Sequence, residues 1–293
     1  MTERMIRIGI SGWVYPSWRG SFYPPGLPQR LWLAHASRSF GTIEVNGTFY
    51  SLKTPASFRR WVAETPEDFV FAVKGARFIT HMKKLKDVEQ PLATFFAQGL
   101  LGLGAKLGPI LWQLPAAMPF DAGRLESFLA LLPRDTAGAA RLARRRNRRI
   151  LGGRTLLEPA ALCPLRYALE VRHESFRAPE VAKLLRRWGV ALVIADAPEW
   201  PRFDMATADF VYLRLHGATE LYASGYDPPA LASWARRVRR WAAQGLDVFV
   251  YFDNDAKIRA PADARALAER LGLTPGEGGA APARGESGPR KHR

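Results

Sequence analysis

A short segment near the middle of the chain combines the residue types of a core strand with those of a reactive site. Residues Tyr167–Phe176 read Y-A-L-E-V-R-H-E-S-F, in which two aliphatic residues alternate with Glu170 and Arg172. This period of two predicts a strand that carries the acid and the base on one face. Such a face is unusual in a core, because an unpaired buried charge costs roughly several kcal/mol. A carboxylate beside a guanidinium could instead hold a charged substrate or transfer a proton.

Polar or ionisable residues stand at the end of almost every strand that the sequence predicts. In chain order, these ends carry Glu44 with Asn46, Lys74, Gln113, Glu170 with Arg172 and His173, Asp196, Arg214 with His216, and Asp253 with Asn254. Independent structural reasons would not confine polar groups to one end of each strand. We therefore expect a functional site where these strand ends meet.

Two roles follow from the chemistry of these side chains and of nearby loop residues. Cationic groups would bind a phosphate or carboxylate, whereas a carboxylate or a histidine would act as an acid or a base. The candidate catalytic residues are Glu170, Glu44, Asp196, Asp253 and His216. The candidate substrate-binding residues are Lys74, Arg172, Arg214, Gln113, Asn46, Asn254, Trp13, Tyr15 and His81.

Each of these residues also has a purely structural interpretation. Glu170 and Arg172 could form an ion pair that fills a layer of the core, and taken alone they slightly favour that interpretation. Asp196 and Asp253 could cap the helices that follow them. A single loop histidine such as His216 is more often a hydrogen-bonded residue than a ligand. The functional interpretation depends on the joint pattern over all the strands.

The predicted elements alternate between strands and helices. The strands are rich in Val, Ile, Leu and Phe, as in parallel sheets covered on both faces. Eight strand–helix units in about 270 residues favour a single-domain α/β fold, a TIM (β/α)8-like barrel. A doubly wound open sheet is the alternative, but G-I-S-G-W in the first strand does not match G-x-G-x-x-G. The predicted strands span residues 7–11, 42–46, 69–74, 109–114, 167–172, 191–195, 210–215 and 248–252. The predicted helices span residues 31–39, 55–63, 91–107, 124–132, 134–149, 180–188, 229–244 and 262–271.

Length and composition predict a soluble intracellular protein. The chain has 293 residues, of which 47% are hydrophobic, enough for a sizeable core. The lone Cys163 rules out an internal disulfide and fits a reducing cytoplasm. No apolar run approaches the roughly 18 residues that span a bilayer, and no signal-peptide block is present. We expect a cytoplasmic protein with a barrel at residues 1–273 and a disordered basic tail at residues 274–293.

The net charge of +16 is concentrated in a few segments. Residues 141–154 hold seven arginines and no acid, and residues 236–240 hold four more arginines. Such clusters attract nucleic acid electrostatically. Arginine-rich helix surfaces in solvent give the same pattern and are the more common case.

No motif of a familiar metal site or nucleophile is present. The sequence contains neither H-E-x-x-H nor G-x-S-x-G, and Cys163 precedes a proline with no base nearby in sequence. Histidines and carboxylates stand at separate predicted strand ends, so binding of a divalent metal by several loops stays an open alternative. No motif supports it. The sequence predicts no particular cofactor.

Seven stretches resemble the YecE-like family, the domain of unknown function numbered 72. They lie between residues 6 and 271 and read I-G-I-S-G-W, E-V-N-G-T-F-Y, F-A-V-K-G with I-T-H, L-W-Q-L-P, L-E-V-R-H-E-S-F, V-Y-L-R-L-H-G, and V-Y-F-D-N-D followed by A-P-A-D-A. The resemblance implies a TIM barrel and no particular activity. Asn46 with Gly47 is similar to the family's usual Asn-Ser, whereas Asp253 stands where an asparagine is common. A distant likeness to metal-dependent TIM-barrel nucleases is an analogy of fold alone.

Three functions fit these observations. The leading one is an enzyme that acts on an anionic substrate at the carboxyl-terminal mouth of the barrel, with a phosphoester, including one in nucleic acid, as the lead substrate class. The second is a non-catalytic nucleic-acid-binding protein that uses the basic helices and the aromatic loop at residues 13–23. The third is a sugar or small-metabolite isomerase or lyase. We expect an anionic small molecule or nucleic acid as the partner and no membrane, and the oligomeric state stays open.

Overall fold

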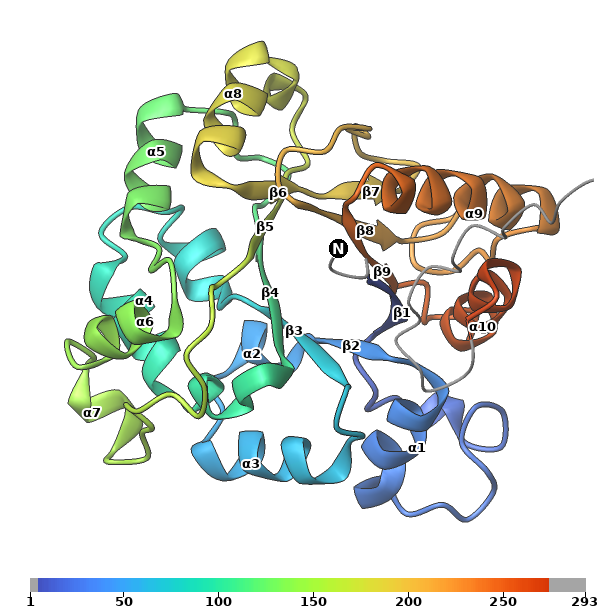
Figure 1. Cartoon of the computed structure of the whole chain (residues 1–293), viewed down its shortest axis with the longest axis horizontal. Helices are drawn as coiled ribbons and strands as arrows, with labels where there is room; N and C mark the ends of the chain where they lie inside the picture. Colours follow the sequence, from blue (N-terminus) through green and yellow to red (C-terminus); the bar gives the residue numbers. More distant parts are fainter. Residues whose placement is uncertain (1–4, 274–293) are drawn as a thin grey trace, which may run out of the picture.

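A computed structural model describes residues 5–273, and its centre is a ring of parallel strands surrounded by helices (Figure 1). Nine strands form one sheet in the order β6-β5-β4-β3-β2-β1-β9-β8-β7, and each paired strand runs parallel to its neighbour. The strands are β1 (Ile6–Ser11), β2 (Thr42–Val45), β3 (Val70–Lys74), β4 (Leu107–Gln113), β5 (Tyr167–Glu170), β6 (Val190–Leu192), β7 (Ile194–Asp196), β8 (Phe210–Leu215) and β9 (Asp247–Phe252).

The ring closes through one divided strand. β6 pairs with β5. After one intervening residue, Val193, the chain continues as β7, which pairs with β8. Beside β6, the hydroxyl of Thr207 replaces a neighbouring strand, because it accepts from the N–H of Leu192 and donates to the carbonyl of Val190, both at 2.7 Å. The expected strand at 191–195 is therefore present but changes partner at Val193. The predicted TIM barrel is confirmed.

The strands are buried on both faces, which explains their nearly continuous apolar sequence. One face packs beneath the helices in the main core. The other face points into the barrel, where a second buried cluster includes Ala72, Ala168, Tyr212 and Tyr251. Because side chains alternate along a strand, the residue two positions after each of these also points inward. That position is the one at which the polar residues of the strand ends occur.

Helices connect most strands to the next one, although the described segment between β7 and β8 contains none. Several begin at a capping side chain; for example, Thr54, Asp121 and Asp227 each accept a hydrogen bond from a backbone N–H three residues further on. The helices are α1 (Trp32–Ser39), α2 (Gly47–Tyr50), α3 (Pro55–Glu64), α4 (Glu89–Ala97), α5 (Ala122–Leu131), α6 (Thr136–Ala143), α7 (Arg148–Leu151), α8 (Pro179–Trp188), α9 (Pro228–Ala243) and α10 (Ala260–Leu271).

Two of the predicted helices are interrupted. The helix expected at 91–107 becomes α4 and a separate 3₁₀ segment, because Gly99 between them has a φ of 120° that a helix cannot continue through. The helix expected at 134–149 becomes α6 and α7. Asn147 between these helices is extended, and its side chain accepts from the N–H of Arg149 to cap α7. The short helix α2 was not expected.

The aromatic loop after β1 serves mainly to pack the core. Trp18, Phe22 and Tyr23 are buried, and the ring of Tyr23 stacks on Trp32 of α1 at a centroid distance of 4.6 Å. These three rings are therefore not available to stack on bases, and that part of the nucleic-acid hypothesis is wrong. Trp13 and Tyr15 remain partly exposed.

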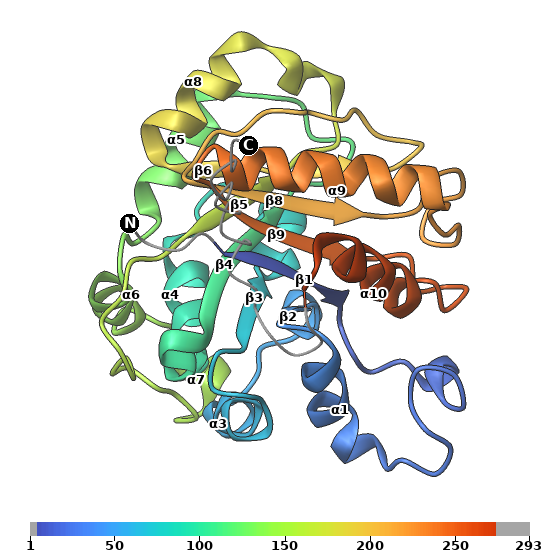
Figure 2. The same cartoon turned by 45° about the vertical axis from the view of Figure 1, so that its right-hand side comes forward.

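The arginine clusters are partly neutralised within the fold. Arg144 pairs with Glu158 at 2.7 Å. In α9, Arg237 pairs with Asp204 and covers the ring of Trp234, 4.4 Å from its centroid. This helix starts near the end of β8 and runs back beside the strand (Figure 2), so its last turns lie at the opposite end of the barrel from the strand ends.

Two further predictions concern membrane-spanning segments and the tail of the chain. Within residues 5–273, no helix is long and apolar enough to cross a membrane. The expected tail at residues 274–293 lies outside the described residues. The division of the chain at residue 273 therefore stays a prediction.

Candidate functional site

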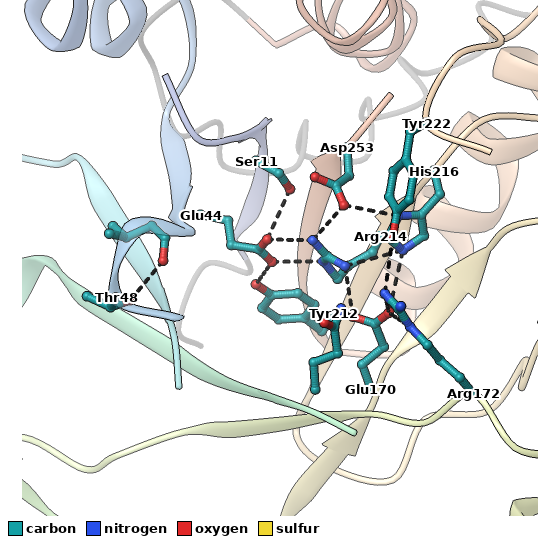
Figure 3. Close-up of polar contacts among 12 residues, drawn as sticks. Ser11, Glu44, Thr48, Glu170, Arg172, Tyr212, Arg214, His216, Tyr222 and Asp253 are labelled. Atoms are coloured by element: carbon teal, nitrogen blue, oxygen red, sulfur yellow. Dashed lines mark hydrogen bonds and ion pairs between the residues drawn. The ribbon is translucent and has the colours of Figure 1, made fainter. Parts of the chain in front are cut away.

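A buried arginine is the centre of the polar cluster at the carboxyl-terminal ends of the strands (Figure 3). Arg214 of β8 points into the barrel, where three carboxylates surround its guanidinium. Its Nε and Nη2 donate to the two oxygens of Glu44 in β2, at 3.0 and 2.8 Å. Its Nη1 donates to Glu170 and its Nη2 also donates to Asp253, both at 2.8 Å. All three nitrogens are therefore engaged, which makes Arg214 an organiser of the cluster rather than an open cationic site.

Glu44 is held on both of its oxygens. Besides Arg214, Oε1 accepts from the hydroxyl of Ser11 at 3.1 Å and Oε2 accepts from the hydroxyl of Tyr212 at 2.6 Å. Burial, followed by the nearby charge of Glu44, raises the pKa of Tyr212 well above its ordinary value. Tyr212 therefore stays protonated and remains a donor to the carboxylate.

Glu170 links the centre of the cluster to its edge. Its Oε2 accepts from Gln113 of β4 as well as from Arg214, each at 2.8 Å. Its Oε1 accepts a hydrogen bond from Nε of Arg172 at 2.9 Å and lies 2.8 Å from Nη2 in the same ion pair. Burial alone would raise the pKa of Glu170, but the two guanidiniums and His216 outweigh it and hold the pKa well below its ordinary value. Glu170 is therefore an ionised anchor and a weak base near neutral pH.

Asp253 follows β9 and has a similar electrostatic environment. Burial opposes its ionised form, but Arg214 and then His216 lower its pKa to about 2. The Nδ1 atom of His216 lies 3.1 Å from Oδ2 of Asp253, although the two groups are out of line for a hydrogen bond. The other ring nitrogen of His216 lies 3.3 Å from Nη1 of Arg214. Arg214 and His216, which lie two residues apart, therefore share one face.

Arg172 forms one side of the mouth together with two aromatic residues. Its guanidinium carbon lies 3.5 Å from the ring centroid of Trp200, and its Nη2 is 3.5 Å from the hydroxyl of Tyr222. Both rings also contact the imidazole of His216, with centroid distances of 5.1 and 5.4 Å. Arg172 is therefore fixed by an ion pair with Glu170 and by stacking.

Lys74 differs from the other cations of the cluster. Its side chain points inward at the end of β3 and is only 8% exposed, yet within residues 5–273 its ammonium has no hydrogen bond or ion pair. Its Nζ lies 4.5 Å from the ring centroid of Phe49. Burial and the positive charge of Arg214 lower the pKa of Lys74 to about 8, although Glu44 and Glu170 partly oppose this change. Lys74 therefore changes its protonation state near neutral pH.

His81 lies near the same edge of the mouth. Its ring contacts Phe49 at a centroid distance of 5.1 Å, and its Nδ1 is 2.9 Å from the hydroxyl of Thr80. Burial, Lys74 and Arg172 lower the pKa of His81 to about 4. The imidazole is therefore neutral near pH 7 and does not compete with Lys74 for an anion.

The side chains of the remaining predicted residues form none of the hydrogen bonds or ion pairs around Arg214, although the hydroxyl of Tyr15 adjoins the cluster and donates to the carbonyl of Ser11 at 2.6 Å. Asp196 points away from the barrel interior, since its neighbour Ala195 points inward, and it pairs with Arg202 at 3.0 Å. Asn254 donates to the carbonyl of Ser224 and to Asp263, at 2.9 and 2.8 Å, and so fixes a loop against α10. Three others line a separate pocket of about 420 Å³ beside the mouth, namely Trp13, Tyr15 and Asn46.

The cluster does not fit a divalent metal ion in this arrangement. Within residues 5–273, no group of three His, Cys, Asp or Glu side chains is placed to hold an ion. Glu44, Glu170 and Asp253 converge instead on the guanidinium of Arg214, which occupies the position that an ion would need.

Sequence reasoning missed four residues that contact the cluster. Ser11 ends β1, and Tyr212 lies two residues before Arg214, so the alternation of side chains could have identified both. Trp200 and Tyr222 come from the long segments on either side of β8. No periodicity in those segments indicates that they return to the mouth.

Two curated proteins match part of this chain in sequence. The chain is 32% identical over 130 residues to the UPF0759 protein YecE of Escherichia coli K12, a match that covers 44% of this chain and 45% of that protein. It is 30% identical over 116 residues to the UPF0759 protein YunF of Bacillus subtilis, covering 38% of this chain and 40% of that protein. The matches thus span less than half the length of these curated relatives.

Two solved structures match the fold of this chain over most of its length. A crystal structure of a DUF72 family protein from Thermotoga maritima has a TM-score of 0.72 at 24% identity and covers 92% of this chain and 99% of that chain. A DUF72 family protein from Enterococcus faecalis has a TM-score of 0.69 at 17% identity, covering 94% and 100% of the two chains. At these identities the likeness shows the fold alone. The family model extends over residues 7–286, and the chain therefore belongs to the family described as protein of unknown function DUF72.

Proposed function

We propose that this chain is an enzyme that binds an anionic small molecule at the carboxyl-terminal mouth of the barrel, with a phosphoester as the leading substrate class. The main support for the proposal is the environment of the Lys74 ammonium. Among the described residues its ammonium is buried without a hydrogen-bond acceptor, although three carboxylates lie in the same cluster. A buried charge without partners is costly, so a bound anion is the partner that would offset this cost.

The carboxylates of the cluster form their ion pairs with arginines and not with Lys74. Arg214 and Arg172 saturate Glu170, and Arg214 also holds Glu44 and Asp253. These residues position the mouth and balance its charge. A phosphate group has several oxygens that accept charge-assisted hydrogen bonds, and the three protons of an ammonium match it.

Lys74 is also the best-placed group for proton transfer. The carboxylates of Glu170 and Asp253 have lowered pKa values, which makes them poor bases near pH 7. A catalytic acid or base works best when its pKa lies near the working pH. With a pKa of about 8, Lys74 meets this condition, and it would donate a proton to a leaving oxygen of the substrate.

The same property of Lys74 favours a second candidate, a sugar or small-metabolite lyase. With a pKa of about 8, roughly a tenth of the side chain is the free amine at pH 7. A free amine attacks a carbonyl carbon and forms an imine with loss of water. Reduction with cyanoborohydride in the presence of a carbonyl substrate would then add mass to the peptide that contains Lys74.

The arrangement is less favourable to a protein that only binds nucleic acid. Of the aromatic rings expected to stack on bases, three are buried in the core. The arginines of α9 lie towards the other end of the barrel and are partly engaged by Asp204 and by tryptophan rings. These observations favour the mouth over the basic helices as the site of the proposed function.

A ligand screen with matched variants tests the proposal. The melting temperature of the wild type would be measured with inorganic phosphate, glucose 6-phosphate, AMP and pyruvate, and again with Lys74→Met and with the exposed control Lys86→Met. Phosphoesters should raise the melting temperature of the wild type and of Lys86→Met but not that of Lys74→Met, because binding stabilises the folded state by mass action. Equal shifts in all three proteins, or none in any, would reject the proposal.

A further inference from the structure

A second hollow lies outside the cluster around Arg214 and is built mainly from apolar side chains. It has a volume of about 610 Å³ and is lined by residues of α2, the π-helical turn Phe78–Met82, α4 and the loop and helix around α7. A volume of this size is typical of a small-ligand pocket. Because its walls come from four separate elements, it is a concave site rather than one open face.

The walls of this pocket gather exposed apolar side chains. Four of the most exposed large apolar residues in the described part of the chain line it, with exposed fractions from 44% to 71%; they are Tyr50, Phe78, Met82 and Ile150. Single exposed apolar residues are ordinary, but a contiguous group of them marks a binding surface.

Two cationic side chains that line the same pocket are available to bind an anion. Arg77 and Lys83 line it, and within residues 5–273 neither forms an ion pair or a hydrogen bond through its side chain. Asp87 is also part of the lining, so the three charges leave the pocket with one net positive charge. The backbone supports a built site as well, because Lys84 and Leu85 next to Lys83 have φ angles of 49° and 67°. Such strain in residues other than glycine concentrates at ligand-binding loops.

We propose that this pocket binds a small amphiphilic monoanion, in which an apolar chain or ring fills the hollow and a carboxylate lies at Arg77 and Lys83. The apolar walls account for the chain, and the single net positive charge accounts for the anion. The proposal does not depend on the function assigned to the mouth, because Lys74 does not line the pocket. Phe49 separates the two sites, since its ring lies beneath Nζ of Lys74 and also forms part of the pocket wall.

Calorimetric titration with octanoate, 1-octanol and acetate tests this proposal. Octanoate should bind the wild type, and octanol and acetate should each bind at least about tenfold more weakly, because each lacks one of the two recognised parts. Met82→Asp and Ile150→Asp should each weaken octanoate binding by about tenfold or more, since they place a like charge in an apolar wall. Leu162→Asp is the matched control, because Leu162 is 80% exposed and is not part of the pocket lining.

The possible results separate this site from the mouth. Unchanged octanoate affinity in Leu162→Asp and in Lys74→Met, together with weak binding in Met82→Asp, supports the pocket. Loss of octanoate binding in Lys74→Met would place the ligand in the mouth and overturn the proposal. Equal affinity of octanoate in the wild type, Met82→Asp and Ile150→Asp, or no binding to the wild type, would also overturn it.

Discussion

The guanidinium of Arg214 donates two hydrogen bonds across the barrel to the carboxylate of Glu44, from Nε at 3.0 Å and from Nη2 at 2.8 Å. Both side chains are fully buried. A two-point pair of this kind fixes the relative position of β8 and β2, because the planar guanidinium and carboxylate match only in one orientation. The other groups at the mouth are arranged around this pair.

Removing the guanidinium should destabilise the protein strongly. Arg214→Met leaves Glu44, Glu170 and Asp253 without their shared partner, and breaking a buried ion pair costs about 3–5 kcal/mol. Urea unfolding measures the loss. Arg236→Met replaces an exposed arginine of α9 and should change the free energy of unfolding by less than about 0.5 kcal/mol. A loss for Arg214→Met no larger than that of the control would mean that the cluster contributes little to stability.

The stability of the fold should fall in acid partly because of Asp253. Its pKa in the folded protein is about 2, below the ordinary value of 3.8, so the stabilisation is present above pH 3.8 and is lost as the pH falls towards 2. Two pKa units correspond to at most about 2–3 kcal/mol. Asp253→Asn should therefore be less stable than the wild type at pH 6, and the difference should shrink towards pH 2. A difference that stays constant over this range would show that the carboxylate titrates normally.

Lys74 should reduce stability at neutral pH. Its folded pKa of about 8 lies below the ordinary 10.5, so the unfolded chain binds more protons between these values and stability rises with pH across that window. Below pH 8 the buried ammonium opposes folding. Lys74→Met should therefore raise the free energy of unfolding at pH 7 by about 1–3 kcal/mol, whereas Lys86→Met should have little effect. A less stable Lys74→Met protein would contradict the reading of Lys74 as an unpartnered charge.

The arginines of α9 should not contribute to the response at the mouth. Replacing Arg236, Arg237, Arg239 and Arg240 with Gln removes four charges near the opposite end of the barrel. The shift of melting temperature caused by phosphate should match that of the wild type. If phosphate or single-stranded DNA binding fell sharply in this variant and its salt dependence flattened, the basic helix would be the functional surface instead.

Much of the arrangement could be predicted from the alternation of side chains. Glu170 with Arg172, and Arg214 with His216, share faces because they lie two residues apart on strands. The same rule places Asp196 outside the barrel, since it lies one residue after the inward-pointing Ala195. The expectation that Asp196 joins the others is wrong, because Asp196 lies on the outward face of β7.

Other features depend on distances between separate elements. No sequence pattern indicates that Arg214 takes three carboxylates while Lys74 takes none, because that outcome depends on the reach of each side chain across the barrel. The contacts of Trp200 and Tyr222 depend on long segments that have no periodicity. The division of the strand at Val193 depends on Thr207, which hydrogen-bonds to β6 in place of a neighbouring strand.

Titration of Lys74 itself tests most directly whether its buried ammonium binds an anion. In protein labelled with ¹³C at the lysine ε-carbon, the Lys74 resonance is identified by its absence from Lys74→Met, and its shift is followed against pH with and without inorganic phosphate. We expect a pKa of about 8 for Lys74 without phosphate and a higher pKa with it, because a bound anion favours the ammonium. A pKa near the ordinary 10.5 that does not respond to phosphate would contradict the proposed role of Lys74 as an anion-binding group.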